Sequence, residues 1–373
     1  MKISALRSTP VAVPSTQGYV PVVIVEVFTD KGLIGLGEAP CPTGTEAAKT
    51  LIESARPLLL GQDPLQPEPL KKRLYAAFNL THLHIHAACW ALNAIDMALW
   101  DVVGKACGQP LYRVWGGAFR KRIPFYASVS HELPPDAAAA KAAEYVAQGY
   151  GTIYRKVGLD EENDLACLKA IREAIGPSVK LRVDANQSWS AGEAIRIIRR
   201  MAEYDLEFVD QPVLMYNVDE LARVRAASPV PIAAHEASWT MYEALQVIKR
   251  GAADVIHVDP RFDAGMMGAR VTAGMAEAAG LPVVMHHFST LGVALCAYLH
   301  VIASCPNFTY ANQTGYFRLY DDVLAGGLVP IEGGSIAVPE EPGIGVTLDA
   351  DKMATYSAAY EQHVRGREFS QPT

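Results

Sequence analysis

Hydrophobic residues in the middle of the chain recur in short runs, and each run ends on a polar side chain that could take part in chemistry. Successive runs are about 25 residues apart, which is the length of one strand plus one helix of a (β/α)8 barrel. The side chains at the ends of these runs are Lys156, Asp184, Asp210, Glu236, Asp259 and His286. Because the active site of such a barrel lies at the carboxyl ends of its strands, the spacing predicts that these side chains meet in one place.

The first part of the chain does not follow this rhythm. Residues 22–29 are rich in valine and isoleucine, and residues 33–38 are the return strand of a predicted hairpin across the turn Asp30-Lys31-Gly32. Residues 88–103 carry apolar side chains near a 3.6-residue period, which predicts a helix that ends at Gly108-Gln109-Pro110. We therefore expect an α+β domain over residues 1–122.

The alternation of strands and helices predicts an α/β barrel domain over residues 123–320. The remaining residues, 321–373, are rich in glycine and proline and contain too little periodic sequence for a further domain. We expect this C-terminal segment to pack back on the N-terminal α+β domain.

Composition narrows the functional classes. Half of the 373 residues are hydrophobic and the formal net charge is −7, so the chain is globular and lacks the basic surface of a nucleic-acid-binding protein. No uncharged apolar stretch reaches about 18 residues, the minimum for a membrane span, and no signal-peptide pattern is present. The six cysteines are scattered without a Cys-x-x-Cys pair. These features predict a cytoplasmic protein with reduced cysteines and with neither a nucleic-acid nor a membrane partner.

Three acidic residues, Asp184, Asp210 and Glu236, follow successive predicted strands. Convergent carboxylates repel one another, and a hard divalent ion such as Mg2+ relieves that repulsion because it prefers oxygen ligands. The alternative is three unrelated surface acids at the starts of loops. Their common register along the chain favours a metal site. Asn186 shares the strand face of Asp184 and is a candidate substrate contact.

Acid–base candidates flank this predicted metal site. Lys156 ends a strand on the same face as Tyr154, so Lys156 is a candidate base, or else a cation that only neutralises the acids. Asp259 and His286 end consecutive strands, and a carboxylate beside an imidazole orients a histidine base; the alternative is a buried histidine with a structural partner. The adjacent His287 is an alternative base. His257, two residues before Asp259, is expected to face the same way as a packing residue.

Several segments resemble the enolase superfamily. Within the predicted helix of the N-terminal domain, AIDMALWDVVGK (94–105) resembles the capping-domain helix of that superfamily, and QPLY (109–112) with WGG (115–117) is similar to its link into the barrel. The other matching segments are VDANQSW (183–189), FVDQP (208–212) and PGIGV (342–346). The resemblance covers nearly the whole chain.

This resemblance implies a modified TIM barrel, (β/α)7β, beneath an α+β capping domain that the C-terminal segment completes. It also implies Mg2+ bound by Asp184, Asp210 and Glu236, and removal of the proton alpha to a substrate carboxylate to give an enediolate. A carbon acid of this kind is too weak for a side-chain base unless the developing charge is stabilised where it forms. Relatives in the superfamily are often homo-oligomers, so we expect a homo-oligomer.

Asp259 with a following His286 resembles the mandelate racemase subgroup, in which Lys156 and His286 lie on opposite faces of the substrate. That subgroup consists mostly of acid-sugar dehydratases, so the resemblance implies dehydration of an acid sugar or other hydroxy acid. Racemisation or epimerisation of a 2-hydroxy or amino acid is the alternative reaction. A non-catalytic barrel that binds a ligand is the alternative of another class.

The chain departs from the subgroup at three positions. Tyr154 stands where the subgroup usually has a first lysine, so it is a candidate to assist catalysis as a hydrogen-bond donor or an acid. Asp210 stands where the subgroup has a glutamate. Asn312 takes the place of a glutamate at the end of the eighth strand, so it is a candidate substrate contact that can donate a hydrogen bond but no proton. Substrate specificity is expected to come from capping-domain loops at residues 14–19 and 78–86.

Overall fold

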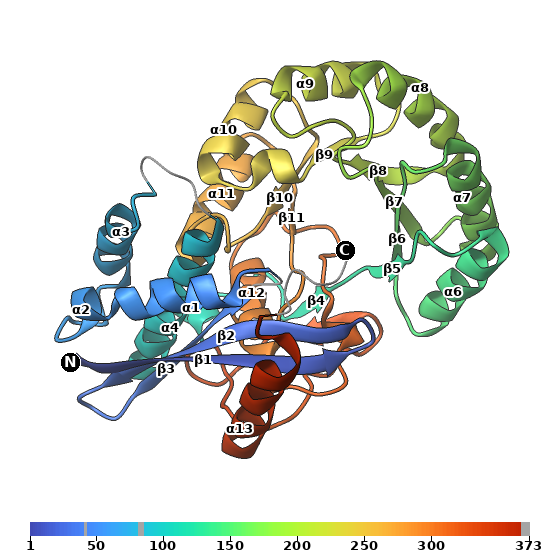
Figure 1. Ribbon diagram of the computed structural model, residues 1–373. Coiled ribbons are helices and arrows are strands. Elements are labelled where there is room, and N and C mark those ends of the chain that lie inside the picture. Colours follow the sequence, from blue (N-terminus) through green and yellow to red (C-terminus); the bar gives the residue numbers. More distant parts are fainter. Residues whose placement is uncertain (41–42, 81–85, 367–373) are drawn as a thin grey trace.

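The structure is a computed structural model that describes residues 1–40, 43–80 and 86–366. The N-terminal domain has an antiparallel sheet covered on one side by helices (Figure 1). The strands are β1 (Ile3–Ser15), β2 (Gly18–Thr29) and β3 (Ile34–Pro40), and the helices are α1 (Thr45–Ser54), α2 (Arg56–Leu59), α3 (Pro67–Ala77) and α4 (His86–Cys107). The predicted hairpin is β2–β3, whereas β1, which pairs with β2 along its whole length, was not predicted.

Close packing between β3 and α4 explains two of the glycines in the hairpin. A Cβ atom at Gly35 or Gly37 would overlap the carbonyl oxygen of Ala98 or Ala94 on α4. These glycines let strand β3, which is part of an antiparallel sheet, approach the helix closely.

The second domain is a ring of parallel strands with helices around its outside (Figure 1). Its seven-stranded sheet contains β5 (Ala127–Val129), β6 (Thr152–Lys156), β7 (Lys180–Asp184), β8 (Leu206–Asp210), β9 (Ile232–Ala234), β10 (Val255–Val258) and β11 (Val283–Met285), in sequence order. The helices are α6 (Pro135–Ala147), α7 (Glu161–Ile175), α8 (Ala191–Met201), α9 (Val218–Ala227), α10 (Met241–Lys249), α11 (Met266–Ala278) and α12 (Gly292–Ala303). The predicted class, a modified TIM barrel with an α+β capping domain, is confirmed.

Local sequence sets where several of these helices begin. Asp160, Ser190 and Thr240 are the N-cap residues of α7, α8 and α10, and each side chain accepts a hydrogen bond from a backbone N–H of the first turn. In α8 and α10 a glutamate at the third helical position completes a capping box. Each helix therefore starts a few residues after the strand that precedes it, which keeps the strand ends open above the barrel.

An irregular segment around Asn312 joins the two edge strands of the parallel sheet. The backbone N–H of Asn312 donates to the carbonyl of Pro124 at 2.8 Å, and its carbonyl accepts from Tyr126 at 3.0 Å. On the other side, the N–H of Gln313 donates to the carbonyl of Met285 at the end of β11 at 3.1 Å. The eighth position of the ring is therefore closed by backbone pairing without a regular strand.

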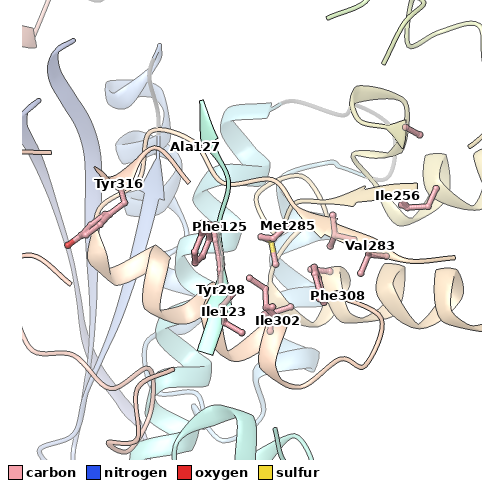
Figure 2. Packing of buried hydrophobic residues seen from close by; sticks show 14 of the residues in the cluster. Ile123, Phe125, Ala127, Ile256, Val283, Met285, Tyr298, Ile302, Phe308 and Tyr316 are labelled. Atoms are coloured by element: carbon pink, nitrogen blue, oxygen red, sulfur yellow. The ribbon is translucent and has the colours of Figure 1, made fainter. Parts of the chain in front are cut away.

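Buried hydrophobic residues fill the base of the barrel and extend under the capping domain. Ile123 of β4 (Arg122–Pro124) and Phe125, which follows it, lie in one cluster with Tyr298 and Ile302 of α12 (Figure 2). This packing fixes the orientation of α12 relative to the ring.

The C-terminal segment contacts both domains. Strand β12 (Ser335–Ala337) pairs with β4 (Arg122–Pro124), and α13 (Ala350–Ala359) packs against β1 (Figure 1). The short helix α5 (Leu111–Val114) leads from the capping domain towards β4. Among the helices of the described residues, none combines the length and the apolar character needed to cross a membrane.

Candidate active site

A cavity of about 380 Å3 opens over the carboxyl ends of the barrel strands. Six of the residues predicted from the strand ends and their neighbours line it: Tyr154, Lys156, Asp184, Asn186, Glu236 and His286. The cavity also takes side chains from loops and from the capping domain, among them Gln17, His131, Trp239, Phe288, Gln313 and Arg318. The strand spacing in the sequence thus brings distant polar groups to a single cavity.

Asp184 ends β7 and is held by two donors. The hydroxyl of Tyr154 donates to its Oδ2 atom in a short hydrogen bond, and the backbone N–H of Asn186 donates to its Oδ1 atom at 2.7 Å. Burial raises the pKa of Tyr154 well above its usual value, and the Asp184 carboxylate adds to the shift, so the tyrosine remains a hydrogen-bond donor. Tyr154 therefore fixes the orientation of this carboxylate.

Asn186 links the predicted base to a predicted metal ligand. Its Oδ1 atom accepts a hydrogen bond from Nζ of Lys156 at 3.1 Å, and its Nδ2 atom donates to Oε1 of Glu236 at 2.8 Å. The backbone at Asn186 is left-handed, with φ of 47°, a conformation that asparagine adopts more readily than most residues. Arg155 lies between Tyr154 and Lys156 on β6, so strand alternation turns it away from the interior. It donates to backbone carbonyls of the loop after β5, including that of Ser130 at 2.7 Å.

Asp210 lies deeper, beside two histidines. Its Oδ2 atom is 3.0 Å from Nε2 of His257 and 3.6 Å from Nδ1 of His235, and the two imidazole rings stack with centroids 4.3 Å apart. Nδ1 of His235 is also 3.8 Å from Oε2 of Glu236. Burial raises the pKa of Asp210 well above its ordinary value, and the nearby carboxylates of Asp184 and Glu236 contribute to this shift.

These residues fit a divalent cation. Both carboxylate oxygens of Asp210, Oε2 of Glu236, and both ring nitrogens of His235 and of His257 are buried without a hydrogen-bond partner among the described residues. Unpaired buried polar atoms are costly, and a bound cation would satisfy several of them together. The ligand atoms that all lie within 4.8 Å of one another belong to Asp210, His235 and His257, with Glu236 beside them and Asp184 on the adjoining strand.

The two histidines were missed as ligand candidates. His257 was expected only to pack; it lies in β10, two residues before Asp259. His235 directly precedes Glu236, which begins a short 3-10 helix (Glu236–Ser238) after β9. The sequence does carry a signal for them: each histidine lies within two residues of a predicted strand-end acid, His235 before Glu236 and His257 before Asp259.

His286 pairs with Asp259 as predicted. Nδ1 of His286 is 2.7 Å from Oδ2 of Asp259, and the side chain of Arg261 donates to both oxygens of the same carboxylate. Although burial disfavours its charged form, Arg261 and the bond to His286 hold the pKa of Asp259 below its usual range. Burial lowers the pKa of His286. Nη2 of Arg261 also lies 2.9 Å from Nδ1 of His286. In the tautomer that carries its proton on Nδ1, directed at Asp259, Nε2 of His286 is the basic atom.

The structure places two predicted substrate contacts away from the cavity. His287 is buried, with Nδ1 3.1 Å from the hydroxyl of Thr314, and it is not among the residues that line the cavity. Asn312 is also buried; its Oδ1 atom accepts from the backbone N–H of Met285 at 2.8 Å, so its amide serves the closure of the ring. The next residue, Gln313, faces the cavity instead.

The capping domain contributes to the rim of the cavity. Gln17, in the predicted specificity loop of residues 14–19, accepts a hydrogen bond from Arg318 at 2.8 Å. The guanidinium of Arg318 also lies over the ring of Phe288, 5.7 Å from its centroid. In the second predicted loop, 78–86, residues 81–85 lie outside the described residues.

Comparison with known proteins identifies the family. The family model described as "Mandelate racemase / muconate lactonizing enzyme, N-terminal domain" matches residues 4–116, and the model "Enolase C-terminal domain-like" matches residues 137–352. The chain is 33% identical to the L-Ala-D/L-Glu epimerase of Bacillus subtilis, covering 93% of this chain and 97% of that protein. It is 30% identical to the arabinonate dehydratase of Saccharolobus solfataricus, covering 88% of each.

Solved structures agree with this result. An isomerase from Streptomyces coelicolor A3(2) superposes with a TM-score of 0.90 at 28% identity, covering 97% of this chain and 99% of that one. The dipeptide epimerase from Enterococcus faecalis V583 superposes with a TM-score of 0.86 at 28% identity, covering 93% and 100%. The chain therefore belongs to the mandelate racemase and muconate lactonizing enzyme family of the enolase superfamily, and it is an enzyme of the lyase or isomerase class.

Proposed function

We propose that this enzyme removes the proton alpha to the carboxylate of a small-molecule substrate, through an enediolate, and that the overall reaction is dehydration of an acid sugar or another hydroxy acid. One observation carries this proposal. Lys156 on β6 and His286 after β11 line the same cavity from strands that four other strands separate, so the two side chains approach it from different sides of the ring. The carboxylates of Asp184 and Glu236 line the cavity between them.

The residues of the chain divide the work. A divalent cation held by Asp184, Asp210 and Glu236 would supply the positive charge that stabilises the developing anion, and Mg2+ is the expected ion for ligands that are all carboxylates. One of Lys156 and His286 takes the alpha proton, and the other delivers a proton to the departing hydroxyl group.

The supporting side chains keep these groups in place. Asn186 holds the ammonium group of Lys156 through its amide oxygen, and Asp259 orients the ring of His286. Positioning of this kind lowers the barrier because the reacting groups do not have to be ordered during the reaction.

Racemisation or epimerisation is the second candidate, because the same pair of groups can also act in turn. In that case one group removes the alpha proton and the other returns a proton to the opposite face, so the substrate keeps its hydroxyl or amino group. The 33% identity to an L-Ala-D/L-Glu epimerase favours this reading, whereas the 30% identity to an arabinonate dehydratase favours dehydration.

Proton NMR in D2O tests the proposal. The protein and a divalent metal are incubated separately with acid sugars, 2-hydroxy acids, N-acyl amino acids and dipeptides. We expect at least one substrate to exchange its alpha proton for deuterium, and a 2-keto product marks dehydration. Deuterated substrate of both configurations, without a keto product, marks racemisation or epimerisation.

Variants at both bases provide the control. Replacing Lys156 with Gln and His286 with Asn in one protein removes both groups and is expected to abolish alpha exchange. Exchange at the wild-type rate in this double variant would overturn the assignment of the bases. Binding of a ligand from the panel, with no exchange by the metal-loaded wild type for any compound, would instead point to a barrel that only binds.

A further inference from the structure

The side chains of His235 and His257 lie beside the predicted carboxylate ligands Asp210 and Glu236, although a metal site made only of carboxylates needs no imidazole. His235 and His257 are 5% and 2% exposed, and neither ring nitrogen of either residue has a hydrogen-bond partner among the described residues. Neutral imidazole buried in this way normally directs at least one nitrogen at a donor or an acceptor. Equally unpaired carboxylate oxygens lie within 4 Å: Oδ2 of Asp210 beside both rings, and Oε2 of Glu236 beside His235.

Two distances from Oδ2 of Asp210 match those between neighbouring ligands of one metal ion. With metal–ligand bonds of about 2.1 Å, adjacent ligand atoms are about 3.0 Å apart in octahedral geometry and about 3.4 Å apart in tetrahedral geometry. Oδ2 of Asp210 lies 3.0 Å from Nε2 of His257 and 3.6 Å from Nδ1 of His235. Although Nε2 of His257 is within reach of Oδ2 of Asp210, the two are not aligned for a hydrogen bond. This is the arrangement expected when both atoms face a third partner.

The local fold explains how the rings reach this position. His257 lies in β10, on the interior face two residues before Asp259, and Phe208 of β8 packs edge-on against its ring. His235 follows β9, and its ring stacks on that of His257 on one side and lies edge-on to His286 on the other. The imidazoles are therefore held in place by neighbouring rings, and their nitrogens remain available.

We propose that His235 and His257 are nitrogen ligands of the metal centre, together with Asp210, so that the site prefers a borderline transition-metal ion such as Zn2+, Fe2+ or Co2+ over Mg2+. Imidazole suits these ions, whereas Mg2+ is bound mainly by oxygen ligands. Glu236 and Asp184 complete the set on the side of the cavity. The proposal rests on the proposed function, since it names the ion of the same site, and it replaces the expectation of Mg2+.

Cobalt substitution reports the ligands directly. The purified wild-type protein is stripped of metal, loaded with Co2+ and studied by proton NMR, in which an imidazole bound to Co2+ gives a strongly shifted N–H resonance that disappears in D2O. We expect one such resonance for each of His235 and His257, and each is lost in the corresponding His→Asn variant. A Co2+-loaded wild type without shifted imidazole resonances would overturn the proposal and requires no variant to fold.

Calorimetry with Zn2+, Co2+ and Mg2+ provides the second readout. We expect His235→Asn and His257→Asn each to weaken Zn2+ and Co2+ binding by about tenfold or more, while Mg2+ binding changes by less than about threefold. His363→Asn is the matched control, because His363 is exposed and stacks on Tyr19 outside the cavity. Equal losses for all three metals would contradict a nitrogen ligand, provided that circular dichroism shows folded variants.

The two proposals fail in different ways. If neither histidine binds metal but Mg2+ still supports alpha exchange, only the assignment of the imidazoles is overturned. If no divalent ion binds to the wild type in any of these measurements, the metal-assisted reaction proposed above fails as well.

Discussion

The amide of Asn186 joins Lys156 to Glu236: its oxygen accepts from Nζ at 3.1 Å and its nitrogen donates to Oε1 at 2.8 Å. A lysine side chain has four rotatable bonds, and ordering it costs conformational entropy. A fixed acceptor for its ammonium group lowers the entropy that is lost when the lysine takes up a reactive position. The same amide orients the carboxylate of Glu236, a proposed metal ligand. The proposed base and the proposed ligand are thereby kept in a fixed relation to each other.

Removal of the lysine is expected to impair the chemical step. For a substrate found in the D2O panel, Lys156→Gln should lower kcat by about 10^2- to 10^4-fold, the usual contribution of a general acid or base. Lys180→Gln is the matched control, because Lys180 is exposed at the opposite end of the neighbouring strand β7. Steady-state kinetics checks both variants, and an unchanged kcat for Lys156→Gln would show that this side chain moves no proton.

The tyrosine that holds Asp184 is expected to support metal binding. Tyr154→Phe removes the hydroxyl that donates to Oδ2 of Asp184, and loss of such an orienting group typically weakens metal binding by about 10- to 100-fold. Tyr126→Phe is the control, since the ring of Tyr126 stacks on that of Tyr154 with centroids 4.6 Å apart. Titration calorimetry should find weaker binding only for Tyr154→Phe; equal affinities for the two variants would contradict a role of the Tyr154 hydroxyl in orienting Asp184 for metal.

Closure of the barrel is expected to depend on one buried amide. Asn312→Ala leaves the backbone N–H of Met285 without its acceptor at the seam of the ring, which should cost about 1–3 kcal/mol in the free energy of unfolding. Gln313→Ala, one residue further on, should change this free energy by less than about 0.5 kcal/mol. Urea unfolding followed by circular dichroism measures both. A stability loss of the same size for the two variants would mean that the seam gains nothing from Asn312.

A buried histidine outside the active site is expected to make stability depend on pH. Burial lowers the pKa of His300 from 6.5 to about 4. The folded protein therefore keeps a neutral ring while the unfolded chain takes up a proton, so this contribution is complete above pH 6.5 and is lost as the pH falls towards 4. From these values, the contribution falls by about 2 kcal/mol between pH 7 and pH 5.

Substitution of His300 isolates this effect. The free energy of unfolding of His300→Gln, measured at both pH values, should fall less steeply with acidification than that of the wild type. His363→Gln, at an exposed histidine, should follow the wild type. Parallel curves for wild type and His300→Gln would contradict the lowered pKa.

Periodicity explains which parts of the site the sequence could reveal. Lys156, Asp184 and Asp210 were placed correctly at strand ends because each closes a regular run of buried residues. Periodicity fixes the face of a strand but does not distinguish a ligand from a packing residue on that face, and for this reason His257 was taken for core. The choice between His286 and His287 needed the structure, in which His286 is the residue that contacts Asp259.

Irregular backbone accounts for the remaining differences. The eighth position of the ring is an irregular segment, so counting along an assumed strand put Asn312 at the cavity, which Gln313 lines instead. Strand β1 was overlooked because Pro10 and Pro14 interrupt the alternation typical of a strand. Pairing with β2 over the length of β1 overrides this local signal.

Hydrogen bonds join the capping-domain loop around Gln17 to the barrel loop around Arg318 at the rim of the cavity. The backbone N–H of Thr16 donates to the carbonyl of Arg318 at 2.9 Å, that of Tyr320 donates to the carbonyl of Pro14 at 3.1 Å, and Gln17 bonds to the guanidinium of Arg318. Because of these hydrogen bonds, the loop at residues 14–17 and the loop at residues 318–320 move together. A change of substrate by mutation therefore requires two coupled substitutions. A substitution in the capping loop at residues 14–19 must be matched by a second one in the loop around Arg318.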